Sequence, residues 1–374
     1  MNLQTPLPPA ILAAWLHDLN PFIVEFTPGF GVRWYGTAYA LGFVAGWLLL
    51  RWLSNRGVTP LSVQRITDAM LVLCLGVVLG GRLGYIAFYD PALLVTFTSS
   101  PPWWGVLQLN KGGMSSHGGM IGVLTACWII SRGVKDSNGK RIGALPMLHV
   151  MDLTALACTP GLFFGRLANF VNGELLGSIV TMPGKTPSPW WAVKFPQERF
   201  SGHEPVLSAE QTLSMQRLMD AYRVGAESDA AAYDRVLHIL QSGKGQSAEI
   251  AAKLAPLIAA RHPSQLYQGA AEGLILGLVL LLAWRKPRKP GVIVAFFLIG
   301  YGVMRIITEF YRLPDVNIVM SHILGLSRGQ WLSVAMIGFG ALALYLSRRR
   351  AETYGGWRRR AKMEMGNGEG RPAV

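Results

Sequence analysis

The chain has 374 residues, of which 51% are hydrophobic and 15% charged, and its formal net charge at pH 7 is +14. Several apolar runs approach or exceed the ~20 residues that a helix needs to cross a bilayer, which favours a polytopic helical membrane protein over a soluble one. The basic excess is divided among short segments beside these runs, where attraction to anionic lipid explains it better than nucleic-acid binding does. We therefore expect a lipid bilayer as a partner and no nucleic acid.

Taken in chain order, the apolar runs predict seven membrane spans. Their approximate bounds are 23–50, 68–89, 115–131, 144–165, 264–284, 291–311 and 330–347. Lys and Arg residues gather in the segments that follow the first, third, fifth and seventh spans. Because basic segments are retained on the cytoplasmic side, this pattern predicts an N-terminus outside the cytoplasm and a C-terminus inside it.

The predicted fold class is all-α, a polytopic membrane protein of about seven transmembrane helices with an extracytoplasmic head between spans 4 and 5. Its parts are an N-terminal interfacial arm (1–22), spans 1–4 (23–177), the head (178–262), spans 5–7 (263–347) and a basic cytoplasmic tail (348–374). An amphipathic stretch around Trp15 predicts an interfacial helix. Composition also predicts three helices in the head, near 206–223, 226–241 and 246–260.

Spans 2 and 3 combine glycines with single polar residues. Span 2 carries four glycines whose spacing predicts close approach to another helix: Gly76, Gly80, Gly81 and Gly84. Arg82 among them is either an interfacial or paired structural arginine or a second cation that faces a substrate. His117 begins span 3 between glycines, and is either a hydrogen-bonded structural group or a proton acceptor near neutral pH.

The strongest polar signal stands at the end of span 4. Arg166, Asn169 and Asn172 recur three residues apart, so they share one face if the helix continues, and Glu174 follows them. An arginine at membrane depth costs about 2.5–3.5 kcal/mol and needs a partner, and a guanidinium pairs best with a carboxylate or a phosphate. The motif is either a polar cap of span 4 or the wall of a pocket for an anionic head group.

A second polar stripe lies in span 6. Its members are Tyr301, Arg305, Glu309 and Arg312, at spacings of four, four and three. Arg305 and Glu309 can pair as i,i+4 neighbours, either as a self-neutralised structural pair or as part of an anionic site. For Glu272 in span 5 we expect a structural or entry role.

Six motifs, in order along the chain, resemble those of the bacterial prolipoprotein diacylglyceryl transferases. They are RWYG (33–36), GGRLGY (80–85), GGMSSHGG (112–119), GRLANFVNGELLG (165–177), RHPSQLY (261–267) and FLIGYGVMRIITEFYRLPD (297–315). Ala168 departs from the glycine, and Gln268 from the acidic residue, that the family normally has. The segment 178–262 is longer than is usual for the family, so its role is not implied by the resemblance.

The resemblance implies a transferase of the bacterial inner (plasma) membrane, which catalyses the first step of lipoprotein maturation. Such an enzyme moves the sn-1,2-diacylglyceryl group of phosphatidylglycerol to the lipobox cysteine thiol of a prolipoprotein and releases glycerol phosphate. The resemblance implies catalytic roles for Arg166, Arg305 and His117. It also implies that substrate is contacted by Tyr35, Asn169, Glu174, Gly177, Tyr301 and Glu309. Arg82 is expected to contact substrate as well, as a second cation at membrane depth.

The implied reaction needs a proton acceptor for the thiol and a group that stabilises the leaving phosphate. Arginine is a poor base, so we predict that Arg166 and Arg305 clamp the phosphate, while His117 or the phosphate itself takes the proton. No metal or cofactor is expected, since no Cys/His spacing suits zinc. Two alternatives stay open: a membrane transporter or flippase of an anionic lipid or organic anion, and a non-catalytic scaffold that uses the head.

Overall fold

The computed structural model describes residues 14–27, 30–99, 102–109, 112–135, 137–313, 322–323 and 326–356. Much of the predicted N-terminal arm and of the basic tail lies outside these residues. The chain divides into two compact units. Unit 1 comprises Met1–Ala40, Leu162–Gly273 and Gly302–Val334, and unit 2 comprises Leu41–Gly161, Leu274–Tyr301 and Ala335–Val374.

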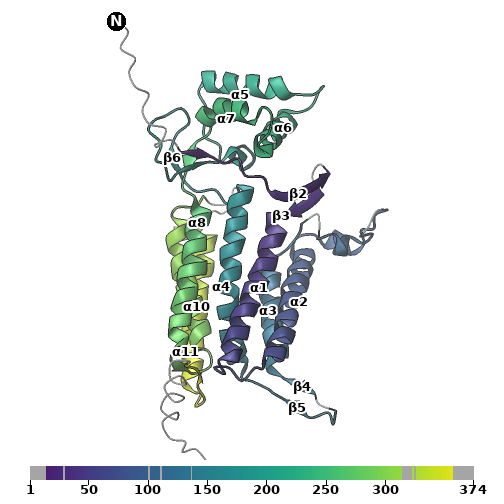
Figure 1. The fold of residues 1–374 in the computed structure, drawn as a ribbon, viewed down its shortest axis with the longest axis vertical. Coiled ribbons are helices and arrows are strands. Elements are labelled where there is room, and N and C mark those ends of the chain that lie inside the picture. The colour runs from purple at the N-terminus through teal and green to yellow at the C-terminus, as the bar shows by residue number, and fades with distance from the viewer. Residues whose placement is uncertain are drawn as a thin grey trace, which may run out of the picture. The chain divides into compact units, whose positions relative to one another are not determined.

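Six of the described helices are long and apolar enough to cross a membrane. They are α1 (Trp34–Asn55), α2 (Val63–Phe88), α4 (Met147–Asn172), the continuous run Ser264–Trp284, α10 (Val292–Glu309) and α11 (Arg328–Arg348) (Figure 1). The run Ser264–Trp284 consists of α8 (Ser264–Gln268), the π-helical η7 (Gly269–Ile275) and α9 (Leu276–Trp284). A shorter apolar helix, α3 (Ser116–Ser131), has 16 residues. The chain is thus mostly helical, as a polytopic membrane protein requires.

Two predictions for the N-terminal part were wrong. The first span does not begin at residue 23, because β2 (Phe22–Thr27) and β3 (Phe30–Arg33) form an antiparallel hairpin and α1 begins only at Trp34. Aromatic and β-branched residues suit a strand as well as a span, which explains the error. The expected helix around Trp15 is also absent from the described residues, since Trp15–Leu16 form β1 and pair in parallel with β7 (Val193–Lys194).

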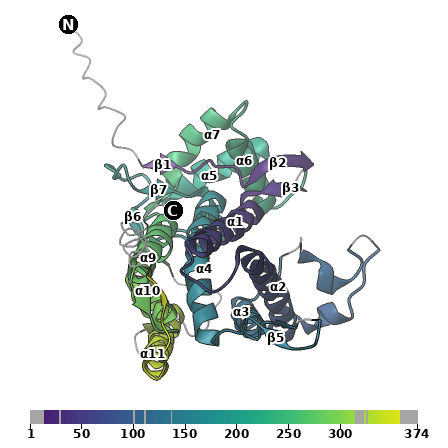
Figure 2. The same ribbon diagram turned by 60° about the horizontal axis from the view of Figure 1, so that its bottom comes forward.

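In unit 1 the head (178–262) contains three α-helices and three strands of a small four-stranded sheet. The sheet has the spatial order β1, β7, β8 (Ala260–Arg261) and β6 (Ile179–Thr181), and β1 lies beside β7 in Figure 2. The three predicted head helices are confirmed as α5 (Ala209–Tyr222), α6 (Asp229–Ser242) and α7 (Ser247–Leu254), which lie together in Figure 1. Short elements complete the unit: η5 (Pro196–Phe200), η6 (Ala255–Leu257), β10 (His322–Ile323) and β11 (Leu326–Ser327).

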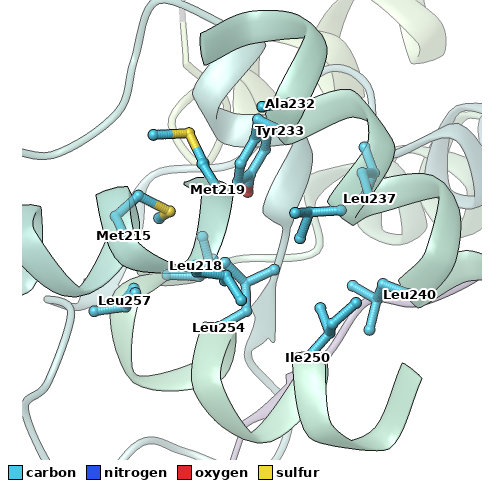
Figure 3. Close-up of a cluster of buried hydrophobic side chains, with 12 residues drawn as sticks. Met215, Leu218, Met219, Ala232, Tyr233, Leu237, Leu240, Ile250, Leu254 and Leu257 are labelled. Carbon is cyan, nitrogen blue, oxygen red and sulfur yellow. The ribbon is translucent and has the colours of Figure 1, made fainter. Parts of the chain in front are cut away.

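The head has its own hydrophobic core. Ser208 begins α5 with a capping box, which satisfies backbone donors at the helix start. Leu218, Tyr233 and Leu254 come from the three head helices and point into one cluster (Figure 3). The buried hydroxyl of Tyr233 donates to the carbonyl of Pro196 at 2.9 Å. Since full burial of a leucine contributes about 1.5–3 kcal/mol, this cluster stabilises the head from within.

Unit 2 shows the predicted close packing of glycines between α2 and α3. A Cβ added at Gly76 would lie 2.6 Å from the carbonyl oxygen of Gly122, so only glycine fits there. Buried Asp152 of α4 accepts hydrogen bonds from the backbone N–H groups of Gly291 (2.8 Å) and Val294 (2.7 Å), and so caps the start of α10. The remaining elements are η2 (Pro91–Leu94), η3 (Gly105–Leu107), β4 (Val134–Lys135), β5 (Arg141–Ile142), β9 (Pro287–Arg288) and β12 (Tyr354–Gly355).

Candidate functional site

Helix α4 continues to Asn172, which brings the arginine and both asparagines of the motif onto one helix. It ends in a Schellman arrangement, in which the N–H groups of Gly173 and Glu174 donate to the carbonyls of Phe170 and Asn169, each at 3.0 Å. Gly173 has φ +66°, a left-handed conformation that glycine adopts without strain. Glu174 follows directly, and its carboxylate accepts from the side-chain amides of Asn169 (3.3 Å) and Asn172 (3.2 Å).

Five charged side chains of unit 1 form an alternating series of ion pairs. This arginine–glutamate cluster consists of Arg166, Glu272, Arg305, Glu309 and Arg312. The Oε2 atom of Glu272 lies 3.1 Å from Arg166 Nη2, and its Oε1 atom lies 3.6 Å from Arg305 Nη1. Glu309 lies 3.2 Å from Arg305 Nη2 and 3.9 Å from Arg312 Nη1. The structure therefore brings the two predicted clamp arginines to a single carboxylate, and it confirms the i,i+4 pair of span 6.

Glu272, for which we expected a structural or entry role, is the member of this cluster that sequence reasoning did not connect to the arginines. Its side chain is fully buried, and Thr308 Oγ1 donates to its Oε1 at 3.5 Å. It lies within the π-helix η7, a rare conformation that is frequent at functional sites. A signal was available: a single carboxylate inside an apolar run needs a partner, and the arginines of spans 4 and 6 needed one as well.

Two glycines of the fifth span let it approach α4 closely. A Cβ added at Gly269 would lie 3.2 Å from Arg166 Cβ, and one added at Gly273 would lie 2.6 Å from Phe163 Cβ. Any larger residue at Gly273 would push the two segments apart. The glycines flank Glu272, so their small size is what allows its carboxylate to reach Arg166.

Arg166 and Arg305 differ from Glu272 in exposure. The side chains of Arg166 and Arg305 are 15% and 12% exposed, whereas that of Glu272 is 0% exposed. Within the described part of the chain, Arg305 Nη1 has no hydrogen-bond partner. A buried donor left in this state costs about 1–3 kcal/mol, and such groups in native proteins call for a specific explanation. A site that receives an oxygen anion provides one.

Gly177 and Tyr35 also belong to unit 1. A Cβ at Gly177 would collide with the carbonyl oxygen of His262 and would lie 2.9 Å from that of Tyr311, so tight backbone packing requires glycine. The ring of Tyr35 lies 5.5 Å from that of Tyr39. The substrate contacts expected of Gly177 and Tyr35 stay predictions.

Arg82 lies in unit 2, where its guanidinium is surrounded by backbone carbonyls. It donates to the carbonyls of Gly105 (2.6 Å), Val106 (2.8 Å), Gly112 (2.8 Å) and Gly113 (2.9 Å). This geometry favours the structural interpretation, in which Arg82 organises the segment between α2 and α3. Its predicted contact with substrate stays a prediction.

His117 and Tyr301 also belong to unit 2. His117 is exposed in the first turn of α3, whose N-cap Ser115 accepts a hydrogen bond from Gly118 N at 3.3 Å. Tyr301 is half-buried, with its ring 5.8 Å from that of Phe297, and precedes Arg305 by one turn of α10. The catalytic role of His117 and the substrate contact of Tyr301 stay predictions.

A buried histidine supports the end of α4. His17 Nε2 donates to the carbonyl of Phe170 at 2.8 Å, and Gln197 Nε2 donates to its Nδ1 at 3.2 Å. Burial lowers the pKa of His17 to about 4, so the ring is neutral at pH 7. The neutral ring ties β1 and η5 to the helix that carries Arg166.

Residues 21–346 match the family described as prolipoprotein diacylglyceryl transferase. The phosphatidylglycerol–prolipoprotein diacylglyceryl transferase of Bdellovibrio bacteriovorus is 38% identical over 360 residues, covering 92% of this chain and 97% of that protein. The proteins of the same name from Rhodospirillum rubrum and Neisseria gonorrhoeae are each 36% identical, over 88% and 87% of this chain and 93% and 94% of their own lengths. The chain therefore belongs to the prolipoprotein diacylglyceryl transferase family.

Proposed function

We propose that this protein transfers the sn-1,2-diacylglyceryl group of phosphatidylglycerol to the lipobox cysteine of a prolipoprotein. The observation that carries the proposal is the sharing of one buried carboxylate, Glu272, between Arg166 and Arg305. Family membership gives the reaction class, and the shared carboxylate gives a reason why two guanidiniums stand ready for one phosphate.

The chemistry is a displacement at carbon. The cysteine sulfur forms a bond to the glyceryl carbon that carries the phosphate ester, the carbon–oxygen bond breaks, and its electron pair goes to the phosphate oxygen. The thiol must lose its proton to an acceptor, because the thiolate is the nucleophile and a free cysteine has a pKa of ~8.5. Glycerol phosphate is released. The residues of the site must therefore stabilise negative charge that gathers on the departing phosphate.

Arg166 and Arg305 take that role. Guanidiniums bind phosphate through two parallel charge-assisted bonds, and Glu272 keeps both in place before the lipid arrives. Asn169 and Glu174 offer amide and carboxylate groups to the glycerol hydroxyls of the head group. Glu309 orients Arg305, from which it lies 3.2 Å away. His117 accepts the thiol proton or positions the peptide, with the substrate phosphate as the competing acceptor.

The same proposal includes a topology. The six long helices and α3 make seven crossings of the bacterial inner membrane, with the N-terminus and the head of residues 178–262 in the periplasm and the C-terminus in the cytoplasm. Basic residues such as Arg56, Arg141 and Lys289 then lie on the cytoplasmic side.

Labelling of single cysteines tests this topology. The background is a chain whose three native cysteines are replaced by alanine, and into it either Ala226→Cys, in the head, or Glu352→Cys, near the C-terminus, is introduced. Both positions are exposed, so each thiol is open to a reagent on its own side of the membrane. In intact spheroplasts a membrane-impermeant maleimide should label the first variant and spare the second. The reverse pattern would overturn the topology.

The test of the activity uses the full-length protein in vesicles that contain phosphatidylglycerol, with a synthetic lipobox peptide. The peptide should gain the mass of one diacylglyceryl unit, and glycerol phosphate should appear in equal amount. A peptide with serine in place of the cysteine is the control and should gain nothing. Movement of phosphatidylglycerol between leaflets without any mass gain would instead support the transporter alternative and overturn the proposed transfer.

A further inference from the structure

The loop that follows α4 is held by an unusually complete set of hydrogen bonds. Five consecutive backbone carbonyls, from Glu174 to Ser178, each accept one. The donors are Gln265 Nε2 to residue 174, Ser264 Oγ to residue 175 (2.9 Å), Leu313 N to residue 176 (2.9 Å), Arg261 Nη1 to residue 177 (3.2 Å) and His262 N to residue 178 (3.1 Å). Three of the five donors are side chains of residues 261–265, so this short segment fixes the course of the loop.

The loop needs that support. Leu175 has φ +55°, a left-handed conformation that is unfavourable for a leucine and persists only where the surroundings enforce it. The loop also connects α4 with the segment that follows α10. Glu174 accepts hydrogen bonds from Asn169 and Asn172 of α4, and Gly177 forms a β-bridge with Arg312. A shift of the loop would therefore move groups of the proposed site on both helices.

Arg261 connects this loop to η5 and the segment that follows η5 in the head. Its side chain is fully buried, and it donates through Nε to Glu198 Oε2 at 2.7 Å and through Nη2 to the carbonyl of His203 at 2.8 Å. Glu198 Oε1 in turn accepts from Ala259 N at 3.0 Å. The guanidinium thus uses its fork to reach a carboxylate and two carbonyls at once, which the single ammonium of a lysine cannot reproduce.

We propose that Arg261, oriented by Glu198 of the head, is a positioning residue for diacylglyceryl transfer, which sets the loop 174–178 and through it the geometry of the site. The inference rests on the proposed function. Its rival is a purely structural ion pair that stabilises the head and has no particular effect on turnover. Because the loss of one partner from a buried ion pair destabilises a protein whatever the role of the pair, the two interpretations are separated by turnover and not by stability.

The test compares two destabilised variants. Arg261→Gln removes the loop contact, and Leu254→Ala weakens the head core without touching the loop. Both are assayed as full-length protein in phosphatidylglycerol vesicles, with thermal unfolding measured alongside. Misplacement of site groups by about 1 Å can lower turnover by about 100-fold, so kcat of Arg261→Gln should fall about 10- to 100-fold with KM for the lipid changed less than about threefold. Leu254→Ala should keep kcat within about threefold.

Two further measurements make the test decisive. Amide hydrogen exchange of residues 174–178 should accelerate in Arg261→Gln and not in Leu254→Ala. Glu198→Gln should lower kcat in the wild-type background but have no additional effect in Arg261→Gln, because it acts through Arg261. Ser264→Ala, which removes only the bond to the carbonyl of Leu175, keeps the test available if Arg261→Gln fails to fold, and should lower kcat about tenfold.

The outcomes separate this inference from the proposed function. Equal loss of kcat in Arg261→Gln and Leu254→Ala, or wild-type kcat in folded Arg261→Gln or Ser264→Ala, overturns the positioning role. Absence of any mass gain by the wild-type protein overturns the proposed function itself.

Discussion

Replacing Glu272 by glutamine tests the central feature of the proposed site. The substitution keeps the size and one carbonyl acceptor of the side chain but removes the negative charge that Arg166 and Arg305 share. At an effective dielectric constant of about 20, charges separated by 3.1 Å and 3.6 Å attract by about 5 kcal/mol each before desolvation is subtracted. Because Glu272 is fully buried, desolvation cancels most of this sum, and the loss of one partner from a buried pair costs about 3–5 kcal/mol.

We therefore expect Glu272→Gln to lose about 3 kcal/mol of stability, at the lower end of that range because glutamine fills the same volume. Turnover should fall about 100-fold, since two guanidiniums without their common anion no longer hold one geometry. The KM for phosphatidylglycerol should stay the same or decrease, because the net positive charge of the site rises. A decrease in kcat without an increase in KM would indicate misplacement of the arginines, whereas an increase in KM would indicate loss of lipid binding.

The assay measures initial rates of thioether formation by mass, at several lipid concentrations, together with thermal unfolding in detergent. Glu249→Gln is the matched control. That glutamate pairs with Lys253 at 2.6 Å on the exposed surface of α7, where such a pair contributes little to stability, so the control should leave kcat unchanged. Wild-type turnover by folded Glu272→Gln would refute the reasoning.

Three further predictions follow from the same geometry. Arg305→Lys should lower kcat by about 100- to 1,000-fold, because an ammonium cannot reproduce the fork of a guanidinium; normal steady-state rates would remove the clamp. If His117 accepts the thiol proton, His117→Gln should abolish the neutral-pH limb of the rate profile, and an unchanged profile would assign the proton to another acceptor. Burial lowers the pKa of His17 from its ordinary value of 6.5 to about 4. Between these two pH values the unfolded chain binds a proton that the folded chain does not bind. The free energy of unfolding should therefore decrease by up to ~3 kcal/mol as the pH falls from about 6.5 to about 4. His17→Asn should flatten this loss in thermal unfolding curves, and an unaltered pH dependence would contradict it.

Local patterns predicted much of the fold. The long apolar runs located the six long helices, and the spacing of Arg305 and Glu309 predicted an ion pair that the structure contains. The head helices α5–α7 were also predicted, because the helix-forming composition of a short window is a local property. Each of these features depends only on residues near one another in sequence.

The errors and omissions come from contacts between distant residues. Strand β1 has two residues and pairs with β7 across more than 170 positions, so no periodic sequence pattern predicts it. Glu272 meets Arg166 across 106 positions, and the meeting depends on a π-helical turn between two glycines. Sequence reasoning identified that an arginine at membrane depth needs a partner, but the choice among partners is made by the packing of three helices.

The unused donor of Arg305 links this packing to catalysis. Interactions accelerate a reaction only if they are stronger in the transition state than in the ground state. As the carbon–oxygen bond breaks in the proposed transfer, the phosphate oxygen gains negative charge that was not present in the bound lipid. Arg305 Nη1 lies 3.6 Å from Glu272 and has no hydrogen-bond partner among the described residues, so its hydrogen-bonding capacity is not consumed before the reaction. A donor held in place by a shared carboxylate, and unsatisfied until charge develops, is the arrangement that selective stabilisation of the leaving group requires.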